Sequence, residues 1–534
     1  MPQVKKTVDA VIVGAGFAGM YLLKRFRDQG LSVQVFEALS DVGGTWLANR
    51  YPGLRCDAES VEYSYSWSKE LQQDWSWTER FATQPEILNY ARYVAERFGL
   101  RSNIQFDTRV ESSVYDEGTG CWTVRTNRGD TVSARYFIMA TGCLSCARLP
   151  DIAGIDSFKG RIYQSADWPK EGVDFSGQRV AIIGTGSTGA QLIPVVAKQA
   201  AHLYVLQRTP AYVVPARNAP LDPNFTAKVK AHYPEIRAAA RKQGLGLYPR
   251  PTESALEVSP EVREQRFEHQ WAIGGPQFMF TFKDMITNQQ ANNYARDFIH
   301  RKIRGIVTRP EVADDLCSHD YPVGGKRICV GTDYYETFNR DNVTLVNLRK
   351  SPIVKITPKR IQTRNGEYEL DAIVFATGFD AMTGALLDID IRGAGGVTLK
   401  DKWAAGPVNY LGLAVAGFPN FFMITGPGSP SVFTNVVMSI EQHVDWICDC
   451  IKHMQSHGLT HFDIKPKAEM EWVQHVNDVA NSTLIPQTNS WYVGANIPGK
   501  PRVFTPYVGG VGPYRERCDQ ETADGYPGFN FTPA

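Results

Sequence analysis

Two glycine patterns with the same spacing carry most of the chemical information in this sequence. The first, Gly14-x-Gly16-x-x-Gly19, lies between an apolar run and a helix-like segment. Gly14 permits a tight turn, Gly16 lets a pyrophosphate approach backbone N–H groups, and Gly19 allows the helix to lie close to the strand. Glu37 follows about 20 residues later, where a carboxylate can accept a hydrogen bond from a ribose hydroxyl. The pattern therefore predicts a site for FAD or NAD, whose ribose carries no phosphate.

The second pattern, Gly184-x-Gly186-x-x-Gly189, includes Ser187 and Thr188 at its variable positions. Here the strand that follows the helix ends in Arg208-Thr209, so a cation replaces the acidic residue. A guanidinium matches a 2′-phosphate and is poorly suited to a bare ribose hydroxyl. This unit predicts NADPH, and the pair of units predicts hydride transfer from NADPH to FAD.

The elements around these patterns indicate the fold class. Both units read as strand, glycine turn, helix and strand, which predicts an α/β protein with two Rossmann-like dinucleotide-binding domains. An apolar strand ending in Ala-Thr-Gly occurs at 137–142 and again at 372–378, which we interpret as the points where the chain leaves and re-enters the first domain. The expected parts are an FAD-binding domain at 1–145 and 371–534 with a C-terminal lid, an NADP-binding domain at 150–210 and 321–370, and a helical insertion at 211–320.

The overall composition is that of an ordinary globular enzyme. The 534 residues are 43% hydrophobic and 21% charged, with a net charge of +1. This balance gives no reason to expect a nucleic-acid partner or a membrane surface, and it makes a cytoplasmic enzyme the default. Nine cysteines scattered through a long chain argue against a disulfide framework. The composition indicates neither a metal site nor an oligomeric state.

Two further patterns resemble those of a known family. Residues 43–57 fit G-G-x-W-x-x-x-x-Y-P-G-x-x-x-D at every fixed position, and residues 158–169 fit F-x-G-x-x-x-H-x-x-x-W-P except that Gln164 replaces the histidine. Together with the two glycine units they resemble the type I Baeyer–Villiger monooxygenases, which are class B flavoprotein monooxygenases. The resemblance covers essentially the whole chain and is strongest to the phenylacetone and cyclohexanone monooxygenase group.

The resemblance implies an activity and a set of site residues. The activity is NADPH- and O₂-dependent insertion of one oxygen next to a ketone carbonyl, through a C4a-peroxyflavin, to give an ester or lactone. Arg327 is implied as the active-site cation and Asp57 as the carboxylate that positions it. Implied FAD contacts are Glu37, Thr45, Trp46, Asp57, Tyr63 and Val110; implied NADP contacts are Arg208, Thr209, Lys326, Arg327 and Trp491; the implied ketone pocket is Ser431, Val432, Phe433 and Thr434.

Two other activities compete with this interpretation. A flavin N- or S-oxygenase would use the same cofactors on amines or sulfides, although an Asp57/Arg327 pair favours attack on carbonyls. The pair Cys143-x-x-Cys146 makes a flavin disulfide reductase conceivable, but it follows a strand end and not a segment expected against the flavin ring. Gln164 can hydrogen-bond but cannot titrate. We therefore interpret position 164 as orienting the two domains and not as a proton donor.

Overall fold

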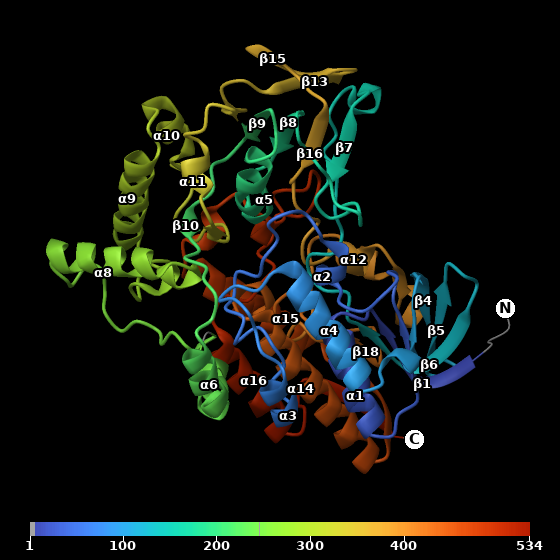
Figure 1. The fold of residues 1–534 in the computed structure, drawn as a ribbon. Helices are drawn as coiled ribbons and strands as arrows, with labels where there is room; N and C mark the ends of the chain where they lie inside the picture. The colour runs from blue at the N-terminus through green and yellow to red at the C-terminus, as the bar shows by residue number, and fades with distance from the viewer. Residues whose placement is uncertain (1–5, 245, 534) are drawn as a thin grey trace.

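Two large β-sheets, seen at the lower right and at the top of Figure 1, form the framework of the protein. This computed structural model describes residues 6–244 and 246–533. The first sheet has the order β17-β4-β5-β6-β1-β2-β3, with β18 paired to β6. Its strands are β1 (Lys6–Val13), β2 (Val33–Phe36), β3 (Ile104–Gln105), β4 (Val110–Asp116), β5 (Cys121–Thr126), β6 (Thr131–Met139), β17 (Asp390–Arg392) and β18 (Phe421–Met423).

Strand β1 lies inside the first sheet and is parallel to both neighbours, β2 and β6. Its second half is fully buried, as expected for a parallel strand covered on both faces. Helix α1 (Phe17–Asp28) returns from β1 and packs against α14 (Val436–Ser456). The N-terminal glycine unit is thus covered by a helix from the far end of the chain.

The second sheet is entirely parallel, with the order β12-β9-β8-β16-β7. Its strands are β7 (Arg161–Gln164), β8 (Arg179–Ile183), β9 (His202–Gln207), β12 (Val343–Asn347) and β16 (Ala372–Phe375), and helix α5 (Ser187–Ala197) follows β8. The expected return to the first domain at residue 371 is therefore wrong. Strand β16 pairs with β8 and β7 inside the second sheet, so the return begins after Phe375.

The repeated Ala-Thr-Gly segments have the same packing role in both units. Gly14 has φ +103°, and a Cβ there would lie 2.7 Å from the carbonyl oxygen of Ala140. Gly184 has φ +112°, and a Cβ there would lie 2.4 Å from the carbonyl oxygen of Ala376. Each alanine follows the strand beside the glycine's own strand, so only glycine permits both the turn and this close approach.

The chain crosses between the two domains twice, and the crossings lie side by side. Ala147 forms an antiparallel bridge with Phe379, and the Met382 N–H donates to the Cys143 carbonyl (2.8 Å). This arrangement agrees with the interpretation of the Ala-Thr-Gly segments as exit and re-entry points.

The helices between the parts of the second domain form the green group at the left of Figure 1. They are α6 (Pro223–Ala231), α7 (Tyr233–Gln243), α8 (Pro260–Ile273), α9 (Gln289–Ile306) and α10 (Pro310–Leu316). Phe267 of α8 and Phe298 of α9 belong to the same buried cluster as Val180 and Val205 of the second sheet. These helices therefore pack onto the second domain.

The C-terminal region returns to the first domain. Its main helices after α14 are α15 (Pro466–Asn481) and α16 (Val511–Ala523), and the irregular segment between them reaches toward the second domain. Across the described ranges 6–244 and 246–533, no helix is both long enough and apolar enough to cross a membrane.

The packing of Gly19 generates a stability prediction. A Cβ at Gly19 would lie only 1.8 Å from the carbonyl oxygen of Gly14, so α1 would have to move away from the sheet. We expect Gly19→Ala to lower the free energy of unfolding by about 3 kcal/mol, the upper end of ordinary overpacking costs, because backbone and not a flexible side chain must yield. Thermal unfolding followed by circular dichroism measures this.

Gly305→Ala is the matched control. Gly305 lies inside α9 with open space at its Cβ position, so alanine there should raise stability by about 0.5–1 kcal/mol. Equal unfolding temperatures for the two variants would show that the close packing of α1 does not matter.

Candidate active site

The first glycine turn and Glu37 form one buried site. The Ala15 and Leu39 N–H groups donate to the two carboxylate oxygens of Glu37 at 2.6 and 2.8 Å. Burial raises the pKa of Glu37 above its usual value, and a ribose hydroxyl donating to the carboxylate would favour the charged form. In the described part of the chain no side chain caps Gly16, so the first-turn N–H groups of α1 are open to a pyrophosphate.

The other expected flavin contacts lie around this site. Trp46 and Tyr63 are buried, and the Trp46 indole donates to the Tyr63 hydroxyl (3.1 Å). Thr45 begins the short helix α2 (Thr45–Ala48) and is exposed. Val110 is buried at the start of β4, in the same apolar cluster as Phe36, the residue before Glu37.

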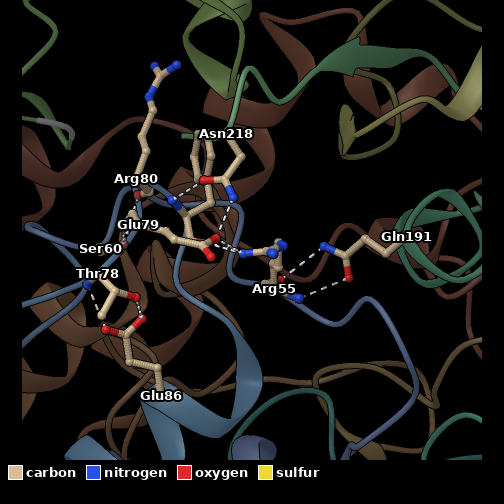
Figure 2. A network of polar contacts seen from close by, with 9 residues as sticks. Arg55, Ser60, Thr78, Glu79, Arg80, Glu86, Gln191 and Asn218 are labelled. Atoms are coloured by element: carbon tan, nitrogen blue, oxygen red, sulfur yellow. Dashed lines mark hydrogen bonds and ion pairs between the residues drawn. The ribbon is translucent and has the colours of Figure 1, made fainter. Parts of the chain in front are cut away.

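A polar network ties the loop that carries Asp57 to the second domain (Figure 2). Gln191 of α5 donates to the Arg55 carbonyl (3.0 Å), while the Arg55 guanidinium pairs with Glu79. Asn218 also donates to the Glu79 carboxylate (2.6 Å). A Cβ at Gly53 would lie 2.5 Å from the Gln191 carbonyl oxygen, so the loop touches α5 directly. These contacts fix the backbone two residues before Asp57.

Arg327 and Asp57 form a bidentate ion pair. Arg327 Nε and Nη2 donate to Asp57 Oδ2 and Oδ1 at 2.6 and 2.7 Å, and Nη1 donates to the Val432 carbonyl (2.7 Å). Burial alone would raise the pKa of Asp57, but the guanidinium lowers it overall, and Asp57 in turn raises the pKa of Arg327. Three of the five guanidinium N–H groups are thus used, leaving two for a ligand.

A cavity of about 370 Å³ opens beside this ion pair. One wall comes from Val432, Phe433 and Thr434, as expected for the ketone pocket. Ser431 is a correction: it does not line the cavity, because its side chain is fully buried and its hydroxyl turns toward the Ser429 carbonyl (3.5 Å). The opposite wall belongs to the insertion and consists of Met279, Phe280, Phe282, Lys283 and Ile286.

Trp491, expected to contact NADP, is not part of this cavity lining. Its neighbour Tyr492 lines the cavity instead and packs against Phe433, with ring centroids 4.7 Å apart. Trp491 is half-buried and packs against Tyr492, with ring centroids 4.3 Å apart. Nothing in the sequence pattern distinguishes which of these adjacent aromatic residues faces inward.

The second glycine turn lies near a cluster of cations. Gly186 is the N-cap of α5, and within the described residues no side chain makes a capping hydrogen bond there. An added Cβ at Gly186 would face open space. Burial and the nearby Arg208 and Arg349 guanidinium groups lower the pKa of Lys326 to about 8. Arg349 also donates to the Thr209 hydroxyl (3.3 Å). Asp320 pairs with Arg349 and offsets part of this repulsion among the cations, and a phosphate dianion would relieve the rest.

Two further features support a polar ligand next to Lys326. The buried hydroxyl of Thr488 has no hydrogen-bond partner within the described residues. It lies beside Gly325, where an added Cβ would be only 2.2 Å from the hydroxyl oxygen. Ser187 and Thr188, at the start of α5, complete the turn, and Ser187 Oγ lies 3.5 Å from Cys329 Sγ. Sequence reasoning identified Arg208, Thr209 and Lys326 but missed Arg349, which approaches only through the fold.

The Cys143-x-x-Cys146 pair lacks the chemistry of a redox dithiol. Burial raises the pKa of Cys143 to about 11 and also raises that of Cys146. Reactive thiols need a lowered pKa. The site therefore offers no support for a disulfide reductase.

The cation cluster generates a pH prediction. Lys326 loses its charge above about pH 8 in the free protein, and a bound 2′-phosphate would raise its pKa, so NADPH affinity should fall as pH rises. We expect KM for NADPH to increase roughly tenfold between pH 7 and pH 9.5, from loss of one charge-assisted hydrogen bond. Steady-state kinetics across this range measure the effect.

NADH and Lys326→Arg provide the controls. NADH has no 2′-phosphate, so its KM should stay level over the same range, and arginine remains charged throughout. A parallel rise for NADH would assign the pH effect to another group.

Comparison with known proteins agrees with this geometry. Residues 5–227 match the family described as flavin-binding monooxygenase-like. A Baeyer–Villiger monooxygenase of Pseudooceanicola batsensis is 46% identical over 97% of this chain and 95% of its own. A phenazine N-monooxygenase of Lysobacter antibioticus is 41% identical over 98% and 97%.

A solved structure of an oxidised steroid monooxygenase bound to NADP is 50% identical, with a TM-score of 0.95 over 99% of this chain and 100% of its own. Both domains, the insertion and the C-terminal segment are therefore common to the two proteins. The comparisons show FAD and NADPH as the cofactors, and the glycine turns and cation cluster described above fit them. The chain belongs to the type I Baeyer–Villiger monooxygenases, NADPH-dependent flavoenzymes that convert ketones to esters or lactones.

Proposed function

We propose that Arg327, held by Asp57, is the group that stabilises negative charge on the ketone oxygen during the reaction. The bidentate contact between the two side chains is the observation that carries this proposal. FAD, which the first glycine turn and Glu37 would hold, would supply the activated oxygen atom after reduction by NADPH and exposure to O₂. When this oxygen adds to the carbonyl carbon, the carbonyl oxygen becomes an anion beside the guanidinium.

The ion pair suits this role because it fixes the cation before charge develops. Asp57 and the Val432 carbonyl hold the guanidinium from two sides, and two N–H groups remain for the oxyanion. Arginine stays charged at any working pH, so no proton has to be supplied to maintain the cation. A preorganised donor of this kind typically contributes about 2.7–4 kcal/mol to the transition state.

The substrate is a ketone with a substantial apolar body. The cavity of about 370 Å³ is within the range of sites that hold drug-sized ligands. Its walls beyond Arg327 are largely aliphatic and aromatic, from Met279, Phe280 and Phe433 among others. The similarity to a steroid monooxygenase supports a substrate larger than a single ring.

N-oxygenation is a second candidate because the chain is 41% identical to a phenazine N-monooxygenase. Transfer of oxygen to an amine leaves no charge on a carbonyl oxygen, so it should depend less on Arg327. Comparing a bulky aryl ketone with an aromatic amine, in parent and Arg327 variants, separates the two activities.

The proposed role of Arg327 predicts that its loss affects the two half-reactions of the enzyme differently. We expect Arg327→Ala to bind FAD and to be reduced by NADPH, because hydride transfer precedes the charge on the ketone oxygen. Ester formation should fall about 10²–10³-fold. The electrons from the consumed NADPH should instead reduce O₂ to hydrogen peroxide. Anaerobic stopped-flow absorbance and product analysis in air measure the two halves.

Arg327→Lys is the matched variant, since it keeps the charge but loses the planar fork. It should retain more ester formation than alanine and less than the parent. Ketone conversion by Arg327→Ala at the parent rate would remove Arg327 from the mechanism.

The position of Gln164 predicts that histidine there is not required. Gln164 ends β7 at the edge of the second sheet, where its carbonyl accepts from the Asp167 N–H (3.0 Å). Within the described chain its side chain makes no hydrogen bond, so no partner there requires a titratable group. We expect Gln164→His to leave FAD content, product identity and coupling of NADPH to product unchanged. A variant that oxygenates ketones where the parent does not would contradict this interpretation.

A further inference from the structure

A second cavity, of about 160 Å³, lies behind the wall of the active-site cavity. It is enclosed by the 402–409 loop, Pro427-Gly428, one face of α15 and the C-terminal stretch 503–505. None of its lining residues belongs to the ion pair or to the cation cluster described above. The cavity therefore needs an explanation of its own.

Two buried side chains line this cavity with unused N–H groups. Trp472 is 3% exposed, and its indole Nε1 has no hydrogen-bond partner in the described part of the chain. Asn409 is 2% exposed, and its Oδ1 accepts from the Gly412 N–H (2.7 Å), which leaves its amino group as the free end. An unpaired buried donor costs about 1–3 kcal/mol, so a ligand that accepts from it gains that amount of interaction.

Gly428 keeps the space between these donors open. Its φ is +78°, and a Cβ there would lie 3.2 Å from the Trp472 Nε1 and 3.7 Å from the Asn409 amino nitrogen. The two polar groups thus converge on one point beside a backbone that has no side chain.

The charge of the lining indicates a neutral ligand. Lys402 is its one charged residue in the part of the chain described, and it already pairs with the buried Glu469 carboxylate (2.9 Å). The remaining walls are apolar and include Val408, Val473 and Phe504. N–H donors in an apolar cavity without a free charge match a carbonyl oxygen better than a carboxylate.

We propose that this cavity is a second binding site, for a small neutral carbonyl compound such as a ketone or a lactone. Its volume equals about five water molecules, which suits a single ring and excludes a polycyclic body. The Trp472 indole and the Asn409 amino group donate to the carbonyl oxygen, and the ring lies against the valines and Phe504.

The site is in contact with the active-site wall. Phe504 lines the second cavity and stacks with Phe433 of the first, with ring centroids 6.2 Å apart. The Gly428 N–H donates to the Thr505 carbonyl (2.6 Å), and the Thr505 N–H donates to the Tyr492 carbonyl (2.8 Å). A ligand in the second cavity therefore touches residues that directly support Phe433 and Tyr492.

The test observes the Trp472 indole itself. FAD-loaded enzyme with ¹⁵N-labelled tryptophan, kept oxidised and free of NADPH, is titrated with cyclohexanone or ε-caprolactone, and Trp472→Phe assigns the resonance. We expect a saturable shift of this resonance with at least one of the two probes, and the probe that binds shows whether the site takes ketone or lactone. Methylcyclohexane, which has no acceptor, should leave it unchanged. A Trp472 resonance that neither carbonyl probe shifts overturns the proposal and indicates ordered water only.

Val473→Phe fills the cavity from the half-buried face of α15, and Met470→Phe, at an exposed position on the same helix, is its matched control. We expect Val473→Phe to weaken probe binding at Trp472 by about tenfold or more, the effect of losing one hydrogen-bonded contact and its space. Met470→Phe should bind like the parent, and both variants should keep the parent kcat for the ketone.

Ala405→Trp gives an independent test if Val473→Phe does not fold, because Ala405 lines the cavity from the exposed loop. Parent-like probe binding in a folded Val473→Phe or Ala405→Trp variant places the probe elsewhere and overturns the proposal. The experiment measures probe binding to resting enzyme. Its result therefore does not depend on whether Arg327 has the catalytic role proposed above.

Discussion

The ion pair between Arg327 and Asp57 is the contact on which the functional geometry depends. It joins a loop of the first domain to a segment that follows the helical insertion, across 270 residues of sequence. Taking two charges partly out of water is costly, and only good geometry with further hydrogen bonds offsets the cost. Here the bidentate fork and the Val432 carbonyl provide both. Removing either partner would leave an uncompensated charge at the cavity.

The surrounding structure holds each end of that pair in place. The Arg55 network and the contact of Gly53 with α5 fix the loop on the Asp57 side. On the Arg327 side, the adjacent Lys326 belongs to the cation cluster, so the residues proposed for the 2′-phosphate and for the ketone are neighbours in the chain.

The C-terminal segment does more than cover the active site. Tyr492 faces the larger cavity, while the stretch from 503 to 505 encloses the smaller one. The Thr505 backbone bonds both to Tyr492 and to Gly428. The same few residues thus form a wall shared by the two cavities.

The sequence alone determined the two nucleotide units, the cofactors they bind and the family. These features follow from short-range spacing, because a glycine turn between strand and helix reports a local backbone conformation that any tertiary context preserves. The pairing of Asp57 with Arg327 came from the resemblance and not from spacing. Only the tertiary structure placed β16 in the second sheet, brought Arg349 to Lys326, turned Ser431 away and placed Tyr492 in the wall of the larger cavity. Each of these depends on contacts between segments far apart in the chain, whose geometry is set by packing and leaves no periodic trace in the sequence.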